Sequence, residues 1–304
     1  MKRTYKKNFT VTVGIPTLNA QKNIKRVLMS LLNQKEDRFT LKKIIVFSDG
    51  SHDKTAEITR SVKDNRIKIV VSSKTRGFAF GVQKILSLAT TDVIVILNDD
   101  VMLVDNLALS RLVAPFNDGK TGLACGNIIP LTPETFIEKA VFSSFKAFSR
   151  IKLELNSGNN VYTCDAKVLA FSHKFAQKVD LFKEPVGNVD LYLYFLCLKS
   201  GFHYQYVKED TIYFRLPQTA KDLFNQTQRA NISRSIVTNK YTDMYIKEVN
   251  DLRIKLYLSI LWETIKNPIG AIAVFFINRF GKYIYGNIDH SFEKWAPAGS
   301  TKNI

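Results

Sequence analysis

Residues Val93–Asp100 read VIVILNDD: five apolar residues, four of them β-branched, run directly into an amide and two carboxylates. A short β-branched run bounded by polar residues is typical of a buried strand. Earlier short apolar runs lie at Val11–Ile15, Ile44–Phe47 and Ile67–Val71. Stretches with helical periodicity separate the runs, at about Asn23–Leu32, Thr55–Val62 and Phe80–Leu88. Short strands alternating with helices predict a doubly wound α/β fold with a parallel central sheet.

The polar residues in this half of the chain follow the predicted strands. They lie at Pro16–Asn19, Ser48–Ser51 and Asn98–Asp100. In open parallel sheets, ligands bind outside the carboxyl ends of the strands. We therefore expect these three segments to line one binding site.

The composition is that of a globular protein. Of the 304 residues, 45% are hydrophobic and 23% are charged, which excludes a disordered or fibrous chain. Three widely spaced cysteines and four histidines offer neither a disulfide framework nor a zinc site. We therefore expect a reducing compartment, and any bound metal would need carboxylate ligands.

The net charge of +17 predicts attraction to an acidic partner, which could be nucleotide phosphates, nucleic acid or anionic lipid. The basic residues are scattered along the chain without a zinc finger, an RNP-like motif or a basic helix, which argues against nucleic acid. The first strand is followed by Pro16–Asn19 and not by G-x-G-x-x-G, which argues against a dinucleotide-dependent oxidoreductase.

The second half of the chain mixes strands with longer helices. Helices are predicted over Pro133–Leu155, Val189–Lys199 and about Pro217–Ile236, strands over Gly122–Ile129, Tyr204–Val207 and Thr211–Phe214, and an extended segment over Val161–Phe171. No linker rich in proline or glycine divides these elements. We therefore expect one domain over residues 1–237 and a distinct helical, amphipathic tail over residues 238–304.

The tail carries two uncharged runs, Leu256–Trp262 and Asn267–Asn278, flanked by lysines and arginines. Neither run reaches the roughly 20 residues that a membrane-spanning helix needs, and no export signal follows the basic N-terminus. A basic, aromatic-rich amphipathic pair predicts helices that lie on an anionic membrane surface, with the protein cytoplasmic and peripheral on the inner face of the membrane. A helical pair packed on the domain, or a dimer face, is the alternative.

Carboxylates follow two of the strands. Asp99 and Asp100 are adjacent and repel each other unless a cation is near, and Mg²⁺ or Mn²⁺ bound together with a diphosphate is the common solution. Capping of a helix is the alternative. Asp49 is placed to accept hydrogen bonds from a base or ribose, whereas Asp53 precedes a helix and is predicted to cap it. Arg76 either meets a diphosphate or is solvated.

Four motifs, taken in order, resemble the nucleotide-binding half of the family 2 glycosyltransferases, which have a GT-A fold. They are Val13–Asn19, Ser48–Thr55, Arg76-Gly77 and Asn98–Asp100. Downstream, Asn188–Leu191 is similar to the Glu-Asp segment of the family, and Gln226–Ala230 is similar to its QxxRW motif. The resemblance covers about residues 10–235. The departures are Asn98 for the first aspartate of D-x-D, Val189 for a glutamate, and Ala230 for the tryptophan of QxxRW.

The resemblance implies a Rossmann-like, mostly parallel sheet flanked by helices, and an inverting, metal-assisted sugar transfer. Asp190 would be the general base, and Asp100 would bind Mg²⁺ or Mn²⁺. Gln226 and Arg229 would position the acceptor or the diphosphate. The residues implied in donor binding are Pro16, Thr17, Asn19, Asp49, Arg76, Gly77, Asn98 and Asp99.

The resemblance also implies a nucleotide-diphosphate sugar as donor, most often a UDP- or GDP-sugar, and a glycan or lipid-linked acceptor. Residues 10–130 would bind the donor and residues 131–237 the acceptor. Ala230 in place of tryptophan favours the addition of one or a few sugars over processive synthesis. A non-catalytic GT-A-like protein that binds a nucleotide sugar or a membrane is the competing interpretation, and the retained Asp49, Asp100, Asp190 and Arg229 argue against it.

Overall fold

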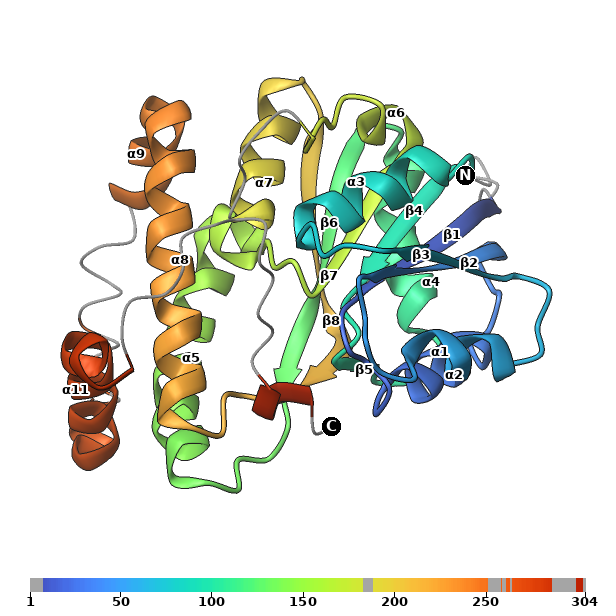
Figure 1. The fold of residues 1–304 in the computed structure, drawn as a ribbon. Coiled ribbons are helices and arrows are strands. Elements are labelled where there is room, and N and C mark those ends of the chain that lie inside the picture. Colours follow the sequence, from blue (N-terminus) through green and yellow to red (C-terminus); the bar gives the residue numbers. More distant parts are fainter. Residues whose placement is uncertain are drawn as a thin grey trace.

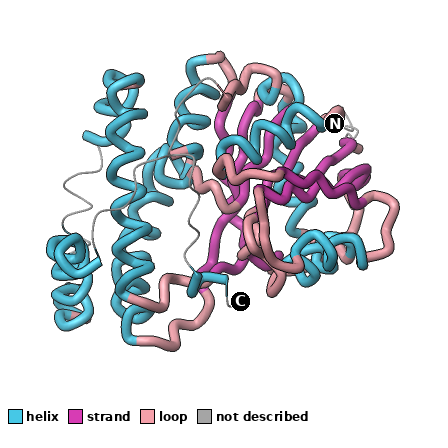
Figure 2. The backbone as a smooth tube through the Cα atoms, in the orientation of Figure 1, coloured by secondary structure: helices cyan, strands magenta, loops and turns pink. Residues whose placement is uncertain are grey.

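The computed structural model describes residues 8–182, 188–250, 258, 261–262, 264–285 and 299–302, without the side chains of residues 150, 229, 231–238, 247–250, 282 and 285. Within these residues the strands form one eight-stranded sheet in the order β3-β2-β1-β4-β7-β6-β8-β5. Helices lie on both faces of the sheet (Figures 1 and 2). The mixed α/β architecture expected from the sequence is confirmed.

The first half of the sheet is parallel and the second half is mixed. The strands are β1 (Phe9–Thr17), β2 (Phe39–Asp49), β3 (Ile67–Ser72), β4 (Val93–Leu97), β5 (Val101–Leu103), β6 (Thr121–Pro130), β7 (Val168–Ser172) and β8 (His203–Phe214). β1 pairs in parallel with β2 and β4, β2 with β3, and β6 with β8. β7 runs antiparallel to β4 and β6, and β5 runs antiparallel to β8.

The two faces of the sheet bury separate apolar cores, since side chains alternate along a strand. The helices are α1 (Ile24–Leu32), α2 (Thr55–Ser61), α3 (Phe78–Leu88), α4 (Ala108–Val113), α5 (Phe136–Glu154), α6 (His173–Ala176), α7 (Val189–Lys199), α8 (Ala220–Lys240), α9 (Thr242–Asn250) and α11 (Pro268–Tyr285), with 3-10 turns η1 (Ala114–Asp118), η2 (Leu155–Gly158), η3 (Val161–Thr163) and η4 (Gly299–Lys302). In β4, Val93, Val95 and Leu97 pack with α1 and α4. Ile94 and Ile96 pack with α3 and α7 on the opposite face. A strand covered on both faces has no solvent-facing position, which explains the uniformly apolar sequence of β4.

Some elements of the second half differ from the sequence-based expectations. The strands predicted at Tyr204–Val207 and Thr211–Phe214 are one strand, β8, because both parts pair with β6 across register shifts near Asn127. The short strand β5 was not predicted. The segment Val161–Phe171 begins with the turn η3 and becomes a strand only at Val168.

The long helices of the second half stand beside the sheet (Figure 1). α5 begins with a capping box in which the Thr135 hydroxyl accepts the N–H of Glu138 and the Glu138 carboxylate accepts the N–H of Thr135. α8 runs unbroken to Lys240, so the domain boundary expected at residue 237 falls inside this helix.

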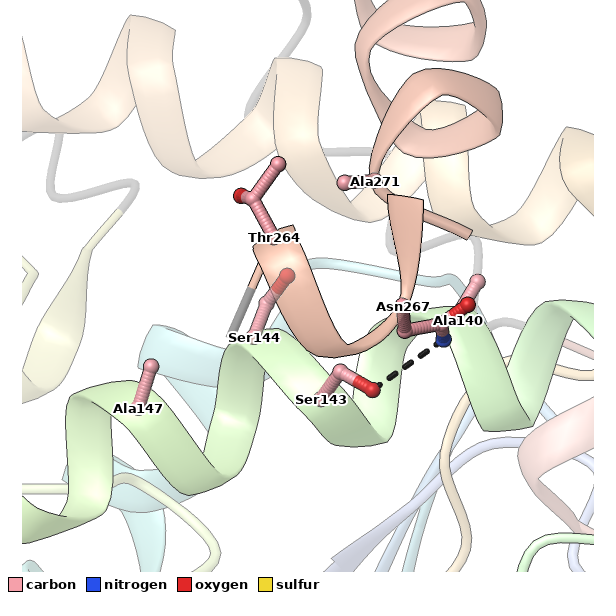
Figure 3. Close-up of a pocket in the computed structure, with 7 residues that line it drawn as sticks. All are labelled: Ala140, Ser143, Ser144, Ala147, Thr264, Asn267 and Ala271. Atoms are coloured by element: carbon pink, nitrogen blue, oxygen red, sulfur yellow. Dashed lines mark hydrogen bonds between the residues drawn. The ribbon is translucent and has the colours of Figure 1, made fainter. Parts of the chain in front are cut away.

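α11 packs one of its sides on α5 and α8. Asn267, just before α11, donates from Nδ2 to the hydroxyl of Ser143 over 3.1 Å (Figure 3). Beside this bond a small cavity of about 20 Å³ lies between the helices. Its lining residues are Ala140, Ser143, Ser144, Ala147, Thr264, Asn267 and Ala271. No helix within the described residues is long and apolar enough to cross a membrane.

Candidate active site

The predicted binding segments meet at one edge of the sheet. β2, β1 and β4 are adjacent and parallel, so the residues that follow them emerge at the same edge. β7 lies antiparallel beside β4, with Val168 opposite Leu97. This register brings the segment before β7 to the same edge, where the N–H of Asn98 donates to the carbonyl of Lys167 over 3.1 Å.

Asp49 ends β2 and is fully buried. Its carboxylate accepts the N–H of Arg76 at 3.0 Å and that of Gly77 at 2.8 Å. Burial raises the pKa of Asp49, and the bonds from Gly77 and Arg76 oppose that shift. Gly77 has a φ of 96°, a backbone conformation that favours glycine. Asp49 therefore fixes the conformation of the Arg76–Gly77 turn. The guanidinium of Arg76 lies over the Phe80 ring, 4.7 Å from the ring centre.

Of the three donor-binding residues predicted at the end of β1 and in the loop after it, two are buried and one is exposed. Pro16 and Thr17 are buried in β1, and the Thr17 hydroxyl donates to a backbone carbonyl of β2. Asn19 is exposed and has a φ of 54°, which asparagine tolerates better than most residues. Its Oδ1 accepts the N–H of His52 over 3.0 Å. Of these three residues, Asn19 is the one that lies on the surface of this edge.

Asp53 was predicted to cap α2, but the N-cap residue is Lys54, and Asp53 lies one position before it. Its carboxylate accepts the N–H of Thr55, the first residue of α2, over 3.0 Å. It also accepts the N–H of Gln21 over 3.0 Å. The same side chain therefore joins the loop after β1 to the helix after β2.

Asp99 and Asp100 follow β4 and both have partners within the protein. Asp99 is almost fully buried, and its Oδ2 accepts the N–H of Leu18 at 3.3 Å and the ammonium of Lys302 at 3.1 Å. Oδ2 of Asp100 accepts the hydroxyl of Thr301 over 3.1 Å. Burial raises the pKa of both carboxyl groups, and the Lys302 charge opposes this.

The oxygens of the Asn98–Asp100 turn suit a hard divalent cation. Asn98 Oδ1 is buried and has no hydrogen-bond partner within the described residues. Carboxylate and amide oxygens are the ligands that Mg²⁺ and Mn²⁺ prefer, and Mg²⁺ commonly takes one or two carboxylates plus substrate phosphates. In the described part of the chain, no cluster of three or more His, Cys, Asp or Glu side chains is arranged to hold a metal. The turn therefore fits a cation whose remaining ligands come from a diphosphate.

The segment η4 also reaches this edge, which was not anticipated. In Figure 1 it lies beside the sheet and apart from α11. The Lys302 ammonium donates to the carbonyls of Leu18 and Asn19 as well as to Asp99. Lys302 and Asp99 are 203 positions apart, and Lys302 is one of 44 lysines and arginines, so no local pattern marks it.

Asp190, the predicted base, lies in the first turn of α7. Its Oδ1 accepts the N–H of Leu191 at 3.0 Å and its Oδ2 accepts the N–H of Ala166 at 3.3 Å. Burial, and then the neighbouring charge of Asp165, raise the pKa of Asp190 to about 6. Such a carboxylate is largely ionised at neutral pH and is more basic than an ordinary aspartate.

Sequence reasoning missed Asp165 and Lys167. The Lys167 ammonium lies 3.2 Å from both oxygens of Asp165. Burial acts to raise the pKa of Asp165, but the charge and hydrogen bonds of Lys167 hold it below its usual value. Burial acts to lower the pKa of Lys167, but Asp165, Asp100 and Asp190 together hold it above its usual value. Lys167 therefore couples electrostatically to both the predicted metal ligand and the predicted base.

Gln226 and Arg229 lie on α8. Gln226 is partly buried one helical turn after Asp222, so both lie on the same face of the helix. Asp222 accepts the N–H of Ser300 in η4 over 3.1 Å, which places η4 along this face. The side chain of Arg229 lies outside the described residues.

Comparison with known proteins identifies the family of the chain. The model of the family described as glycosyl transferase family 2 matches residues 12–174, more than half of the chain. The O-antigen chain rhamnosyltransferase RfbN of Salmonella typhimurium is 32% identical over 123 residues, which are 40% of this chain and 37% of that protein. The match thus spans little more than a third of that relative.

Solved structures resemble the chain over a larger share. Mannosyltransferase PcManGT from Pyrobaculum calidifontis, in complex with GDP-Man and Mn²⁺, matches with a TM-score of 0.60 and 16% identity over 92% of this chain and 77% of that one. Glucosyl-3-phosphoglycerate synthase from Mycobacterium tuberculosis, with Mn²⁺, UDP-Glc and phosphoglyceric acid, matches with a TM-score of 0.54 and 15% identity over 76% and 79%. S. aureus TarS with UDP-GlcNAc matches with a TM-score of 0.51 and 15% identity over 69% and 59%. At these identities the likeness shows a shared GT-A fold.

Proposed function

Because the chain belongs to glycosyl transferase family 2, we propose that it moves a sugar from a nucleotide-diphosphate donor to a hydroxyl of a glycan or lipid-linked acceptor. One observation supports this best. The Asn98–Asp100 turn and the raised-pKa carboxylate of Asp190 lie at the same edge of the sheet, and Lys167 couples to both. The site therefore combines a turn that can bind a diphosphate and its cation with a carboxylate that can accept a proton. Sugar transfer to a hydroxyl requires both.

The proposed donor is a UDP- or GDP-sugar. Two structural neighbours were solved with GDP-Man and UDP-Glc, and the Salmonella relative is named a rhamnosyltransferase, so the nucleotide and sugar vary among similar proteins. The surfaces proposed to receive the donor are Asn19, the Arg76–Gly77 turn and the Asn98–Asp100 turn. Asp49, Pro16 and Thr17 are proposed to act from inside, by fixing these loops.

Mg²⁺ or Mn²⁺, held by Asp100 with Asn98 and Asp99, would neutralise charge on the leaving diphosphate. Lys167 contributes a fixed positive charge near Asp100. That charge favours the ionised form of Asp100, the form that binds a cation.

Asp190 is proposed to take the proton from the acceptor hydroxyl as its oxygen attacks C1 of the sugar. The bond between C1 and the diphosphate oxygen breaks at the same time, and the diphosphate leaves with the electron pair. Attack opposite the leaving group inverts the configuration at C1. The N–H groups of Ala166 and Leu191 hold the carboxylate in place, and its raised pKa makes it a better proton acceptor than an ordinary aspartate.

Gln226 and Arg229 are proposed to position the acceptor or the diphosphate from α8. Gln226 shares a face of α8 with Asp222, which contacts η4 beside the Asn98–Asp100 turn. Arginine suits recognition of a diphosphate because its guanidinium presents a planar fork of donors. Alanine at position 230 favours the addition of one or a few sugars.

We propose further that α11 rests on an anionic membrane surface at the cytoplasmic face. One side of α11 packs on the domain, where Gly281 approaches Phe224 so closely that a Cβ would lie 2.5 Å from its ring. Other positions leave large apolar side chains exposed: Ile269 by 71%, Phe275 by 60% and Ile284 by 73%. Helices with such a face, combined with a charge of +17, bind anionic lipid surfaces.

Sedimentation with vesicles tests the membrane proposal. The protein should pellet with phosphatidylglycerol vesicles and stay in solution with phosphatidylcholine vesicles. Phe275→Ser should weaken the association, whereas Val71→Ser should not, since Val71 is exposed on β3 at the far edge of the sheet. Equal binding to both vesicle types, or to neither, would contradict the proposal.

Nucleotide release from a panel of UDP-, GDP- and dTDP-sugars tests the proposed reaction. Each donor is assayed with Mn²⁺, Mg²⁺ or EDTA, for the wild type, Asp100→Ala and the exposed control Asp37→Asn. The assay needs no known acceptor, because slow hydrolysis releases the nucleotide. We expect metal-dependent release from one donor class, lost in Asp100→Ala and kept in the control. Failure of the folded protein to bind any nucleotide sugar would contradict the proposed function.

A further inference from the structure

The segment η4 occupies the edge of the sheet where the donor and its cation are proposed to bind. Thr301 donates its hydroxyl to Asp100, and Lys302 donates to Asp99. Thr301 and Lys302 are both buried. A nucleotide diphosphate and a cation that use Asp99 and Asp100 would need this same space.

The group that holds Lys302 is built from oxygen alone. Its members are a carboxylate oxygen of Asp99 and the backbone carbonyl oxygens of Leu18 and Asn19. An ammonium has three N–H donors, so the three acceptors saturate it. The Lys302 side chain is 10% exposed, and that of Asp99 is 3% exposed. Lys302 in this position has no donor left for a phosphate, which argues against a direct role in holding the donor.

The segment is anchored on its other side as well. Ser300 donates its N–H and its hydroxyl to Asp222 of α8, and its hydroxyl accepts the N–H of Gln218 over 3.1 Å. η4 therefore bridges α8, which carries Gln226, and the Asn98–Asp100 turn.

We propose that the segment Gly299–Lys302 competes with the donor for its site within the same chain. The Lys302 ammonium takes the place of the divalent cation, and the segment must leave before a nucleotide sugar and its cation can bind. The proposal rests on the proposed function, because it takes Asp99 and Asp100 to belong to the donor site. In the structure Lys302 pairs with Asp99 and Thr301 with Asp100, so a cation that binds these two carboxylates would have to displace both contacts. Donor binding and docking of η4 therefore exclude each other.

Mn²⁺ binding, measured by electron paramagnetic resonance without any sugar donor, tests the competition. Lys302→Met removes the competing charge and shortens the side chain by only one atom. Lys63→Met removes a charge from an exposed position beyond α2. Lys302→Met should bind Mn²⁺ about tenfold or more tightly than the wild type, because the ion no longer has to displace charge-assisted hydrogen bonds. Lys63→Met should bind Mn²⁺ as the wild type does.

A reversible cross-link tests the same idea without removing Lys302. In Asp222→Cys with Ser300→Cys, the two thiols replace side chains that are hydrogen-bonded to each other. The native cysteines are buried and free, so they should not interfere. Oxidation should lock η4 in place and weaken binding of Mn²⁺ and of UDP or GDP, and reduction should restore both.

The outcomes separate this proposal from the proposed function. If Lys302→Met is folded and binds Mn²⁺ no more tightly than the wild type, or if oxidation of the cysteine pair leaves Mn²⁺ binding unchanged, the competition is refuted and the transferase proposal stands. If no variant binds Mn²⁺, UDP or GDP even with η4 released, both proposals are refuted.

Discussion

Replacing Asp165 with asparagine should move the acid limb of the activity profile to lower pH. Asp165 is the neighbouring charge that, after burial, raises the pKa of Asp190 to about 6. A base with that pKa is only about one-tenth ionised at pH 5, whereas one with the ordinary pKa of 3.8 is about nine-tenths ionised. Wild-type kcat/KM at pH 5 should therefore be about a tenth of its plateau near pH 8.

In Asp165→Asn the repulsion is gone, while Lys167 keeps its attraction to Asp190. Each unit by which the pKa of Asp190 falls corresponds to about 1.4 kcal/mol of interaction, and a drop of one unit raises relative activity at pH 5 about fivefold. Lys167→Met should move the limb in the opposite direction, because it removes an attraction to Asp190 and leaves Asp165 unpaired.

The assay is nucleotide release at low donor concentration across the acid range, with circular dichroism to show that each variant is folded. An acid limb in Asp165→Asn that stays in place or moves upward would refute the assignment of Asp190 as the titrating base. The same holds if Asp165→Asn and Lys167→Met shift the limb in the same direction.

Other predictions concern stability and the metal. The pKa of Asp190 in the folded protein lies above its value in the unfolded chain, so ionisation of this group destabilises the fold as the pH rises from about 4 to 6. At pH 7.5 Asp190→Asn should therefore be more stable than the wild type by up to about 3 kcal/mol. The difference should vanish near pH 4. Thermal unfolding at the two pH values checks this, and a less stable variant at pH 7.5 would contradict it. Glu138→Ala should cost about 3–5 kcal/mol in denaturant unfolding, because Arg215, 3.0 Å from this carboxylate, loses its buried partner and α5 loses its capping box. Glu134→Ala removes only the exposed partner of the same arginine and should cost under about 1 kcal/mol. Asp100→Ala should weaken Mn²⁺ binding at least about tenfold, and unchanged binding by calorimetry would exclude Asp100 as a ligand.

The first half of the fold was predictable from sequence because its signals are local. The apolar run Val93–Leu97 needs cover on both faces, and each polar loop directly follows its strand. Parallel pairing then brings the loops to one edge without further information. For the same reason the motif order sufficed to identify the family.

The rest of the site depends on contacts between distant segments, which a local pattern cannot encode. Lys167 lies near enough to Asp100 to interact with it electrostatically only because β7 pairs antiparallel with β4. The two strands are not joined by a turn that would fix this register. An Asp-x-Lys pair just before a buried strand was the available signal for Asp165 and Lys167. The contact of Lys302 with Asp99 spans 203 positions and has no sequence signature.

Asp49 shows a different limit. It was predicted to be a hydrogen-bond acceptor at the end of a strand and to receive hydrogen bonds from the donor, and it does end β2. In the structure its carboxylate receives them from the N–H groups of Arg76 and Gly77. A sequence identifies a buried acceptor at such a position, but the three-dimensional arrangement decides which donors reach it.

The most direct test of the proposed mechanism compares donor binding and nucleotide release in Asp190→Asn and the wild type. Calorimetric titration with the donor identified in the panel is run on the same samples as the release assay. If Asp190 is the base, release should fall by a factor of about 10² to 10⁴ while the donor dissociation constant stays within about twofold. Near-normal release by Asp190→Asn would contradict the mechanism and require another base, and a joint loss of binding and release would show that Asp190 holds the donor instead.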